Sequence, residues 1–366
     1  MNFLKNIFKS KNTPIQSYKE FWAWFCANEQ SFYKVIKGKG DPEKDFFNKL
    51  SPKLNELRDG FWYSAGMYDD NTAELIISAE GVIKNIVFTE ALINAAPKVD
   101  RWKFTALKPA LNIEDVNIEM AGHNFTGKNL HFCVNENAGY PDEIDITVIH
   151  DDYSEEDKSA ITTGVYIFLD HYLGELDFAL NIDNLKVAGR KEADKELIAI
   201  GKLKDYLNWR QKEFVEKYER QTYNTENDQY SLLEANHENG DPLIAVINTT
   251  LLNWDRKASH PWILIVTIPY KENIGKGMPD KNTNSMLEEI ETEIVDELKH
   301  AASYLNIGRQ TGRNLREIYF ACTTFRKPSL SLYKIQKSRE RQFDVSYNIY
   351  KDKYWQSFNR YSQSRL

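Results

Sequence analysis

The order of the apolar patterns along this sequence constrains its fold most. Runs of alternating apolar residues, which are typical of strands, are separated by runs in which apolar residues recur every three or four positions, which is typical of helices. In each half of the chain we predict leading helices and a hairpin, followed by the order strand, helix, strand, strand, helix, strand. That order is characteristic of the ferredoxin-like, or split βαβ, arrangement.

The pattern is clearest in the second half of the chain. A capping sequence at 282–285 precedes apolar residues at helical spacing through Leu298, which predicts a long amphipathic helix. The pair Asn239-Gly240 is a strong turn signal between two predicted strands. The first predicted elements of this half are a helix at 203–218 and a hairpin within 230–249. Strands are then predicted at 262–270, 305–310, 317–323 and 343–350, and helices at 282–298 and 328–339.

The first half repeats this order with weaker signals, and a charged stretch between Gly189 and Gly201 is the predicted linker. Helices are predicted at 17–37, 42–58, 87–96 and 154–173, and a hairpin at 61–68 and 73–79. Strands are predicted at 102–107, 130–134, 144–149 and 176–187, with an additional strand at 118–125. The length of 366 residues, at about 150 residues per domain, indicates two or three domains. We predict an α+β protein of two ferredoxin-like domains, residues 1–195 and 196–366, each with an antiparallel sheet and helices packed on one face.

Composition and cysteine content argue against several protein classes. Apolar residues make up 42% of the chain and charged residues 28%, which is enough apolar area for sizeable cores and argues against global disorder. The three cysteines, Cys26, Cys133 and Cys322, are far apart in the sequence and argue against a disulfide framework. Because no run of 18 apolar residues occurs and residues 1–11 lack the apolar core of a secretory signal, we predict a cytoplasmic protein without stable membrane insertion.

The net charge of −7 conceals a strong asymmetry. Residues 1–200 carry 22 basic and 32 acidic side chains, whereas residues 201–366 carry 25 and 22. The last 66 residues alone hold 13 basic and 4 acidic side chains, while residues 136–157 hold nine acidic side chains and no lysine or arginine. The acidic segment and the basic C-terminal region either dock on each other or each meet a different partner.

Signals for cofactors, metals and nucleophiles are weak. Residues 122–129 approach the phosphate-loop spacing, but they carry Asn129 where a magnesium-binding Ser or Thr belongs and they precede a strand, so a hairpin turn explains them better. His131 and Cys133 share one face of a predicted strand but lack a third ligand. We predict no cofactor and no metal, and we assign no catalytic residue.

His260 is a candidate general base. It lies beside Ser259 and directly before a predicted strand, with Asp255 close enough in sequence to orient it. The alternative is a structural histidine at the start of that strand, with Trp262 in the core.

Asp142, Glu143 and Asp145 form a candidate acidic surface. In a strand, Glu143 and Asp145 share one face, where two carboxylates suit a divalent ion or a basic partner. A solvated loop and sheet face is the alternative.

The most informative cluster is basic and lies around the last predicted hairpin. It consists of Arg309, Gln310, Arg313, Arg316, Arg326 and Lys327. In a split βαβ unit the two strands of this hairpin are neighbours, so the arginines converge near the turn, where their guanidinium groups suit carboxylate or phosphate. Three interpretations stay open: a surface for an acidic protein or for the acidic segment of this chain, a nucleic-acid surface beside Tyr319 and Phe320, and a solvated face.

Six short strings in the second half are distinctive when taken in order. They are SHPWILIVTIPY from Ser259, GMP from Gly277, EEIE from Glu288, NIGRQT from Asn306, REIYFA from Arg316 and DKYW at 352–355. In this order they resemble the bacterial domain-of-unknown-function family 695, over about residues 203–360, and the first half resembles the N-terminal extension of longer members. The resemblance implies a bacterial cytosolic protein, and it supplies no activity and no catalytic residues.

These observations predict a non-enzymatic binding or regulatory protein that acts through charged surfaces on a protein partner of complementary charge. One alternative is an enzyme that acts on a small anionic or nucleic-acid substrate through His260 and the pair Arg309 and Arg316. A second alternative is an immunity-type protein that neutralises a toxin. A nucleic-acid partner ranks behind a protein partner, because the chain is acidic overall.

Overall fold

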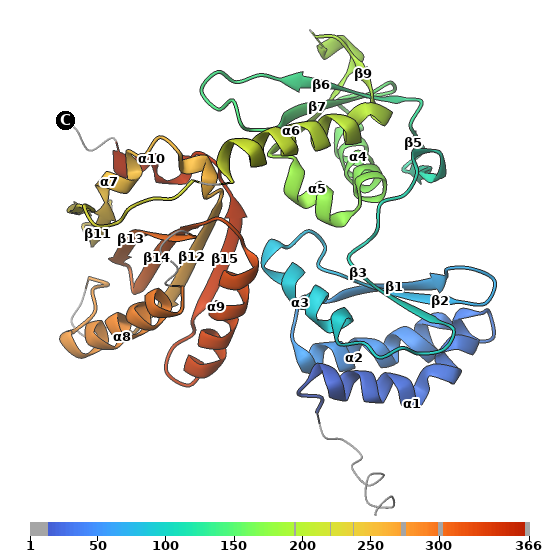
Figure 1. Cartoon of the computed structure of the whole chain (residues 1–366), viewed down its shortest axis with the longest axis horizontal. Coiled ribbons are helices and arrows are strands. Elements are labelled where there is room, and N and C mark those ends of the chain that lie inside the picture. Colours follow the sequence, from blue (N-terminus) through green and yellow to red (C-terminus); the bar gives the residue numbers. More distant parts are fainter. Residues whose placement is uncertain are drawn as a thin grey trace, which may run out of the picture. The chain divides into compact units, whose positions relative to one another are not determined.

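The computed structural model describes residues 14–193, 195–219, 221–236, 238–271, 276–298 and 303–362 (Figure 1). The chain forms two compact units: unit 1 comprises residues 1–111 and 173–176, and unit 2 comprises residues 112–172 and 177–366. Both combine helices with β-sheets, which confirms the predicted α+β class. The division at residue 195 stays a prediction, because a compact unit need not be an independently folding domain. Within the described residues, no helix is both long and apolar enough to cross a membrane.

Unit 1 is a three-stranded sheet with an aromatic core. It consists of α1 (Tyr18–Ile36), a π-helical turn (Glu43–Phe47), α2 (Asn48–Leu57), β1 (Trp62–Met67), β2 (Ala73–Ser78), α3 (Ile83–Asn94) and β3 (Trp102–Ala106). β1 and β2 form an antiparallel hairpin, and β3 pairs parallel to β2. Phe25 of α1 packs edge to face on Trp102, and the buried indole of Trp22 donates to the carbonyl of Leu92 at 2.8 Å. These contacts bury the apolar face of α1 against the sheet and against α3.

The first part of unit 2 contains a four-stranded sheet. It consists of β4 (Ile118–Met120), β5 (His123–Phe125), β6 (Leu130–Asn135), β7 (Asp145–His150), α4 (Lys158–Leu173), α5 (Glu175–Asn181), β8 (Asn184–Gly189), β9 (Ile198–Ala199) and α6 (Leu203–Tyr218), with 3-10 turns at Ile113–Asp115, Arg190–Glu192 and Ile200–Lys202. The strand order is β8-β7-β6-β9, with β7 parallel to β8 and the other neighbours antiparallel. β4 and β5 form a separate hairpin, and Gly122 occupies its turn with a φ of 81°.

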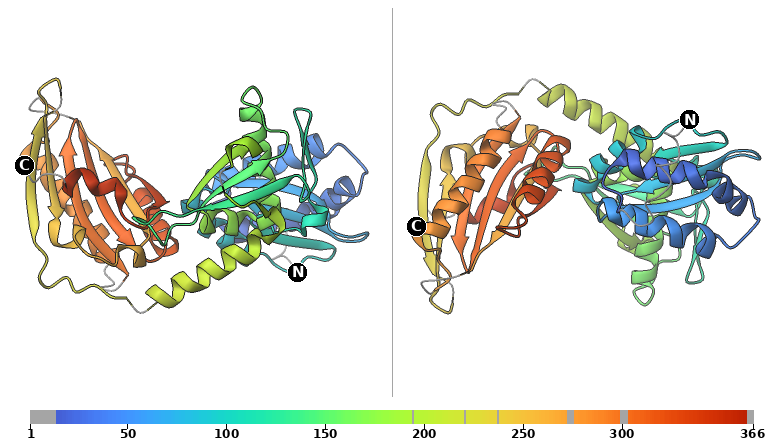
Figure 2. Two further views of the ribbon diagram at one scale, coloured as in Figure 1. Left: turned by 90° about the horizontal axis from the view of Figure 1, so that it is seen from above. Right: turned by 90° about the horizontal axis from the view of Figure 1, so that it is seen from below.

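The remainder of unit 2 is a six-stranded antiparallel sheet. It consists of β10 (Tyr230–Asn236), β11 (Pro242–Asn248), α7 (Thr249–Leu252), β12 (Trp262–Pro269), α8 (Lys281–Glu297), β13 (Tyr304–Gly312), β14 (Leu315–Cys322), α9 (Arg326–Arg339), β15 (Ser346–Lys351) and α10 (Asn359–Ser362), with 3-10 turns at Lys257–Ser259 and Gln356–Phe358. The strand order is β10-β11-β13-β14-β12-β15. α8 and α9 lie side by side over one face of this sheet (Figure 2). On the face of the sheet opposite α8 and α9, Leu251, Trp355 and Phe358 form an apolar core together with Tyr319 of β14.

The two halves depart from the predicted fold in different ways. In the second half the predicted order is present as β12-α8-β13-β14-α9-β15, with the β10-β11 hairpin added beside β13. Helical segments nevertheless cover both faces of this sheet, because α7 and the C-terminal segment carry apolar side chains into the face opposite α8. In the described part of the first half, the expected single antiparallel sheet is replaced by separate sheets, two of which contain a parallel pair. The strands of each parallel pair are joined through helices, α3 in one case and α4 and α5 in the other, as a parallel connection requires.

Candidate functional site

The predicted basic cluster is divided between the two faces of the six-stranded sheet. Arg309 and Arg316 lie on the face that α8 covers. The Arg316 guanidinium is buried and donates to Asn284 Oδ1 of α8 at 2.7 Å, and Arg309 donates to Glu291 of the same helix at 2.9 Å. Burial lowers the pKa of Arg316 from its ordinary value. These two arginines therefore hold α8 on the sheet, and Arg316 is not available to an external partner.

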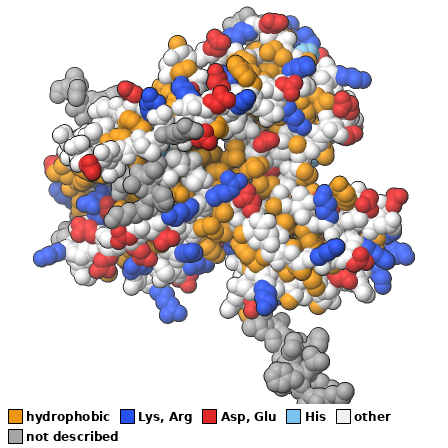
Figure 3. All heavy atoms as spheres, viewed as in Figure 1, with side chains coloured by type: hydrophobic (Ala, Val, Ile, Leu, Met, Phe, Trp, Pro, Cys, Tyr) orange, Lys and Arg blue, Asp and Glu red, His pale blue; other side chains and the backbone are white. Residues whose placement is uncertain are grey.

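The other members of the cluster lie apart from this pair. Gln310 points to the opposite face, where its Oε1 accepts from the hydroxyl of Tyr361 at 2.8 Å. Arg313 is exposed in the β13–β14 turn with a left-handed φ of 54°, and Lys327 is exposed at the start of α9. Arg326 begins α9 and lines a cavity described below. On the face seen in Figure 3, basic and acidic side chains are interspersed, so no single basic patch forms there.

His260 is fully buried at the start of β12. Its Nδ1 lies 2.8 Å from Ser259 Oγ, and its backbone carbonyl accepts from the indole of Trp355 at 2.9 Å. Ser259 Oγ also lies 2.8 Å from the carbonyl oxygen of Arg256, which can only accept. Since a hydroxyl has one proton, both contacts are satisfied when Nδ1 donates to Ser259, and no base is then directed at that hydroxyl. The contacts support the structural interpretation of this histidine.

The sheet does not bring His260 to Arg309. Arg309 is in register with Ile318 of β14, which pairs with Val266 of β12. His260 precedes Val266 by six residues, which is about 20 Å of extended chain. Asp255, the predicted orienting acid, is exposed. The site expected for the enzymatic alternative is therefore not assembled here.

Asp142 of the predicted acidic surface is engaged within unit 2. Its carboxylate accepts from Lys217 Nζ and the Tyr218 hydroxyl, both at 2.7 Å, and from the Tyr354 hydroxyl at 2.6 Å. Burial on its own would raise the pKa of this carboxyl, but these three donors outweigh it and lower the pKa. Asp142 therefore joins the acidic segment to α6 and to the chain that follows β15.

Glu143 and Asp145 have different surroundings. Glu143 Oε1 accepts from the side-chain amide of Gln356 at 2.8 Å, and burial together with the nearby carboxylate of Asp183 raises the pKa of Glu143. Asp145 Oδ1 accepts from Asn135 Nδ2 of the neighbouring strand at 2.7 Å. In the part of the chain that the structure describes, no three His, Cys, Asp or Glu side chains form a group that could hold a metal ion.

Asp183 holds two lysines of the cavity described below, and the sequence did not reveal this contact. Its carboxylate accepts from Lys351 Nζ at 2.7 Å and from Lys353 Nζ at 2.8 Å. Burial and the neighbouring Lys351 lower the pKa of Lys353 to about 8, whereas the two ammonium groups lower the pKa of Asp183. The closing DKYW string contains Lys353, but Asp183 lies 170 residues earlier and no spacing connects the two.

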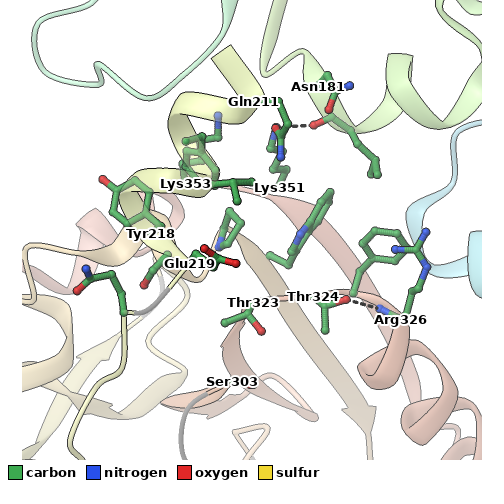
Figure 4. A pocket seen from close by; sticks show the side chains of 18 of the residues that line it. Asn181, Gln211, Tyr218, Glu219, Ser303, Thr323, Thr324, Arg326, Lys351 and Lys353 are labelled. Carbon is green, nitrogen blue, oxygen red and sulfur yellow. Dashed lines mark hydrogen bonds between the residues drawn. The ribbon is translucent and has the colours of Figure 1, made fainter. Parts of the chain in front are cut away.

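The two lysines form one wall of a cavity of about 520 Å³ (Figure 4). The cavity lies among the last turns of α6, the end of α5, the first residues of β12, the ends of β14 and β15, and the start of α9. Its charged lining residues are Lys351, Lys353, Arg326 and Glu219, its hydroxyls include those of Tyr218, Ser303, Thr323 and Thr324, and its apolar lining includes Phe214, Val215, Trp262 and Phe325. The arrangement combines cations, hydroxyl donors and aromatic surface, as small-molecule sites commonly do.

Residues 235–361 match the model of a family of unknown function (DUF695). The match confirms the resemblance drawn from the motifs of the second half, and the preceding residues form an extension on its N-terminal side. It spans the β11–β15 part of the six-stranded sheet with α8 and α9. No curated protein and no solved structure matches this chain. The family description carries no activity, so function has to follow from the cavity and its contacts.

Proposed function

We propose that this chain is a non-enzymatic binding protein that holds an anionic ligand in the cavity at the start of β12 and the ends of β14 and β15. The observation that carries the proposal is the charge of the cavity wall, where three cations, Lys351, Lys353 and Arg326, outnumber the carboxylate of Glu219 and the one Asp183 carboxylate that the two lysines share. A volume of about 520 Å³ lies within the range of small-molecule sites.

The hydrogen-bonding state of Lys351 supports an anion at this place. An ammonium group has three N–H donors. Within the described part of the chain, Lys351 Nζ uses two of them, on Asp183 at 2.7 Å and on the carbonyl of Leu180 at 2.6 Å. The third donor, together with the hydroxyls of Thr323 and Thr324, suits an anionic oxygen of a ligand.

The apolar lining defines the remainder of the ligand. Phe214 and Trp262 offer aromatic surface, and Val215 is 43% exposed beside them. A ligand with an apolar or aromatic body and one anionic group therefore matches the cavity better than a bare ion. The buried state of His260 weakens the enzymatic alternative, and no contact among the described residues favours the immunity-type alternative.

The broader expectations from the sequence belong to this proposal. The strand order β15-β12-β14-β13, with α8 and α9 as connections, supports a split βαβ arrangement for residues 262–351. We also retain a bacterial cytoplasmic protein of regulatory type, whose ligand is either a small molecule or an acidic side chain of a partner protein.

Phenyl phosphate tests the cavity, because it joins an aromatic ring to a phosphate group. We expect the full chain to bind it with a dissociation constant of about 1 mM in a titration followed by ¹H–¹⁵N NMR, with shifts at Thr323, Thr324 and Lys351. Val215→Trp fills the cavity from an exposed helical position, and it should raise the dissociation constant at least about tenfold.

Val82→Trp is the matched control, since Val82 is 39% exposed and lies outside the cavity. It should bind phenyl phosphate as the unmodified chain does. Two results would overturn the proposal: no saturable shifts at the cavity residues, or equal binding by the Val215→Trp and Val82→Trp chains. Turnover of phenyl phosphate to phenol would instead support an enzyme.

A further inference from the structure

A second cavity lies in unit 1 and is lined mainly by charged side chains. Its volume is about 510 Å³, and its walls are the last turns of α1, the loop that follows α1 and the residues just before β3. Four cations, Lys34, Lys37, Lys39 and Arg101, line it together with the carboxylates of Glu29 and Asp100. This excess of positive charge lies at a different place from the cavity in unit 2 and does not depend on it.

Two of these cations lie near the ring of Tyr33. Lys37 Nζ lies 5.7 Å and Arg101 Cζ 5.6 Å from the centroid of this ring. The Tyr33 hydroxyl donates to the carbonyl of Asn71 at 2.9 Å, which fixes the ring. Arg101 has a left-handed φ of 59°, and its carbonyl accepts from the backbone N–H of Ala73 at 2.9 Å. The Arg101 guanidinium itself is 63% exposed and lies 3.6 Å from the Asp100 carboxylate, which also lines the cavity.

The other two cations have no acidic partner within the described residues. Neither the Lys34 nor the Lys39 ammonium group forms an ion pair or a side-chain hydrogen bond there. Lysines in the last turn of a helix complement its dipole, which accounts for Lys34. Lys39 lies beyond the helix end, between Gly38 and Gly40, and Arg101 comes from another element, so the helix dipole does not account for the convergence of all four.

We propose that this cavity binds a small polyanion that carries two or more adjacent phosphate groups. Four cations from two parts of the unit converge on one hollow, and ammonium and guanidinium groups are the side chains that suit phosphate oxygens. The flanking glycines, with φ values of 89° and 152°, leave the Lys39 loop adaptable to the ligand. Because two cations already lie near the Tyr33 ring, the ligand needs no aromatic part.

Pyrophosphate is the probe for this site, with citrate as a carboxylate of comparable charge. We expect the full chain to bind pyrophosphate more tightly than citrate in isothermal titration calorimetry, and the affinity should fall as the salt concentration rises. The Lys34→Glu, Lys39→Glu double variant should lose this binding by at least about tenfold. In ¹H–¹⁵N NMR spectra, the backbone amide signals at the end of α1 and at Arg101 should shift when pyrophosphate is added.

The Lys19→Glu, Lys49→Glu double variant is the matched control, because it makes the same change in net charge at two exposed lysines of unit 1 outside the cavity. It should bind pyrophosphate as the unmodified chain does. Equal binding by the two double variants, or no binding by the unmodified chain, would overturn the proposal, and tighter citrate binding would overturn the phosphate assignment. If the circular dichroism of the Glu variant shows misfolding, the Lys34→Gln, Lys39→Gln chain takes its place with the same expected loss.

Discussion

At the scale of single residues, Arg309 and Arg316 are neighbours on one face of a sheet but differ in side-chain exposure, 30% against 3%. Arg316→Met leaves Asn284 Oδ1 without its donor and removes one cation from Glu291, both in the buried contact with α8. We expect this variant to lower the free energy of unfolding by about 3 kcal/mol. Arg309→Met should cost less than about 1 kcal/mol, because solvent screens its ion pair. Urea denaturation followed by circular dichroism measures both.

Equal losses for the two variants would contradict the role of Arg316 in holding α8. The opposite pattern, in which Arg316→Met leaves stability unchanged but abolishes capture of an acidic partner, would restore the contact surface expected from the sequence.

The sequence predicts that Arg309 and Arg316 lie close together, because they flank a hairpin turn. It does not show which face of the sheet a helix covers, and this decides whether an arginine is a contact residue or a buried support. The alternation of Arg316 with Ile318 and Phe320 is the signal that places it on an apolar face. Asp183 gives no comparable signal, since its partners are set by packing between distant segments.

At the scale of elements, Asp142 connects the last turn of α6 to the chain after β15. Asp142→Ala leaves Lys217, Tyr218 and Tyr354 without their acceptor. We expect the free energy of local opening at the end of α6 to fall by about 2 kcal/mol, measured as faster amide hydrogen exchange of residues 214–218. Asp145→Ala is the control, because Asp145 accepts one side-chain hydrogen bond within its own sheet. Similar exchange rates at α6 in the two variants would refute this role.

Acid tests the same contact without a mutation. The folded pKa of Asp142 lies below its ordinary value of 3.8, so its stabilisation is complete at neutral pH and declines as the pH falls below that value. Protection of the α6 end should therefore fall below about pH 3.8 in the unmodified chain, and the Asp142→Ala chain should lack this step. A step that persists in the variant would assign it to another carboxyl.

Element order was predictable where the local pattern is strong. The amphipathic segment became α8, although Asp280 caps it and the predicted cap at 282–285 lies within the helix, and the alternating run after His260 became β12. The pairing of strands was less predictable, because apolar alternation indicates which residues of a strand face the core but not which other strand lies beside it. Crossover helices join the strands of the parallel pairs β2–β3 and β7–β8. The sequence of these helices does not indicate which strand the chain pairs with after the crossover.

At the scale of the whole molecule, the charge asymmetry is partly neutralised within unit 2. Asp142 binds Lys217, and Asp183 binds Lys351 and Lys353, so acids of the first half meet bases of the second. The balances of −10 and +3 therefore overstate the charge that each half presents to a partner. A smaller local excess of cations remains at the two cavities, even when the Asp183 carboxylate is counted against Lys351 and Lys353.

Unit 1 is completed by residues 173–176, which the chain supplies after it has already built part of unit 2. Glu175 is buried there, and its carboxylate accepts from the backbone N–H groups of Ala79, Gly81 and Lys108 at 2.8, 3.2 and 3.1 Å. Glu175→Ala should lower the opening free energy of β2 by about 3 kcal/mol, because one buried and two partly buried backbone donors lose a charged acceptor. Hydrogen exchange with mass spectrometry on the full chain should show this loss in residues 73–78 and none in β12 and β14. The exposed Asp177→Ala chain should leave both regions unchanged, and an equal loss of protection in β12 would show that the two units open as one.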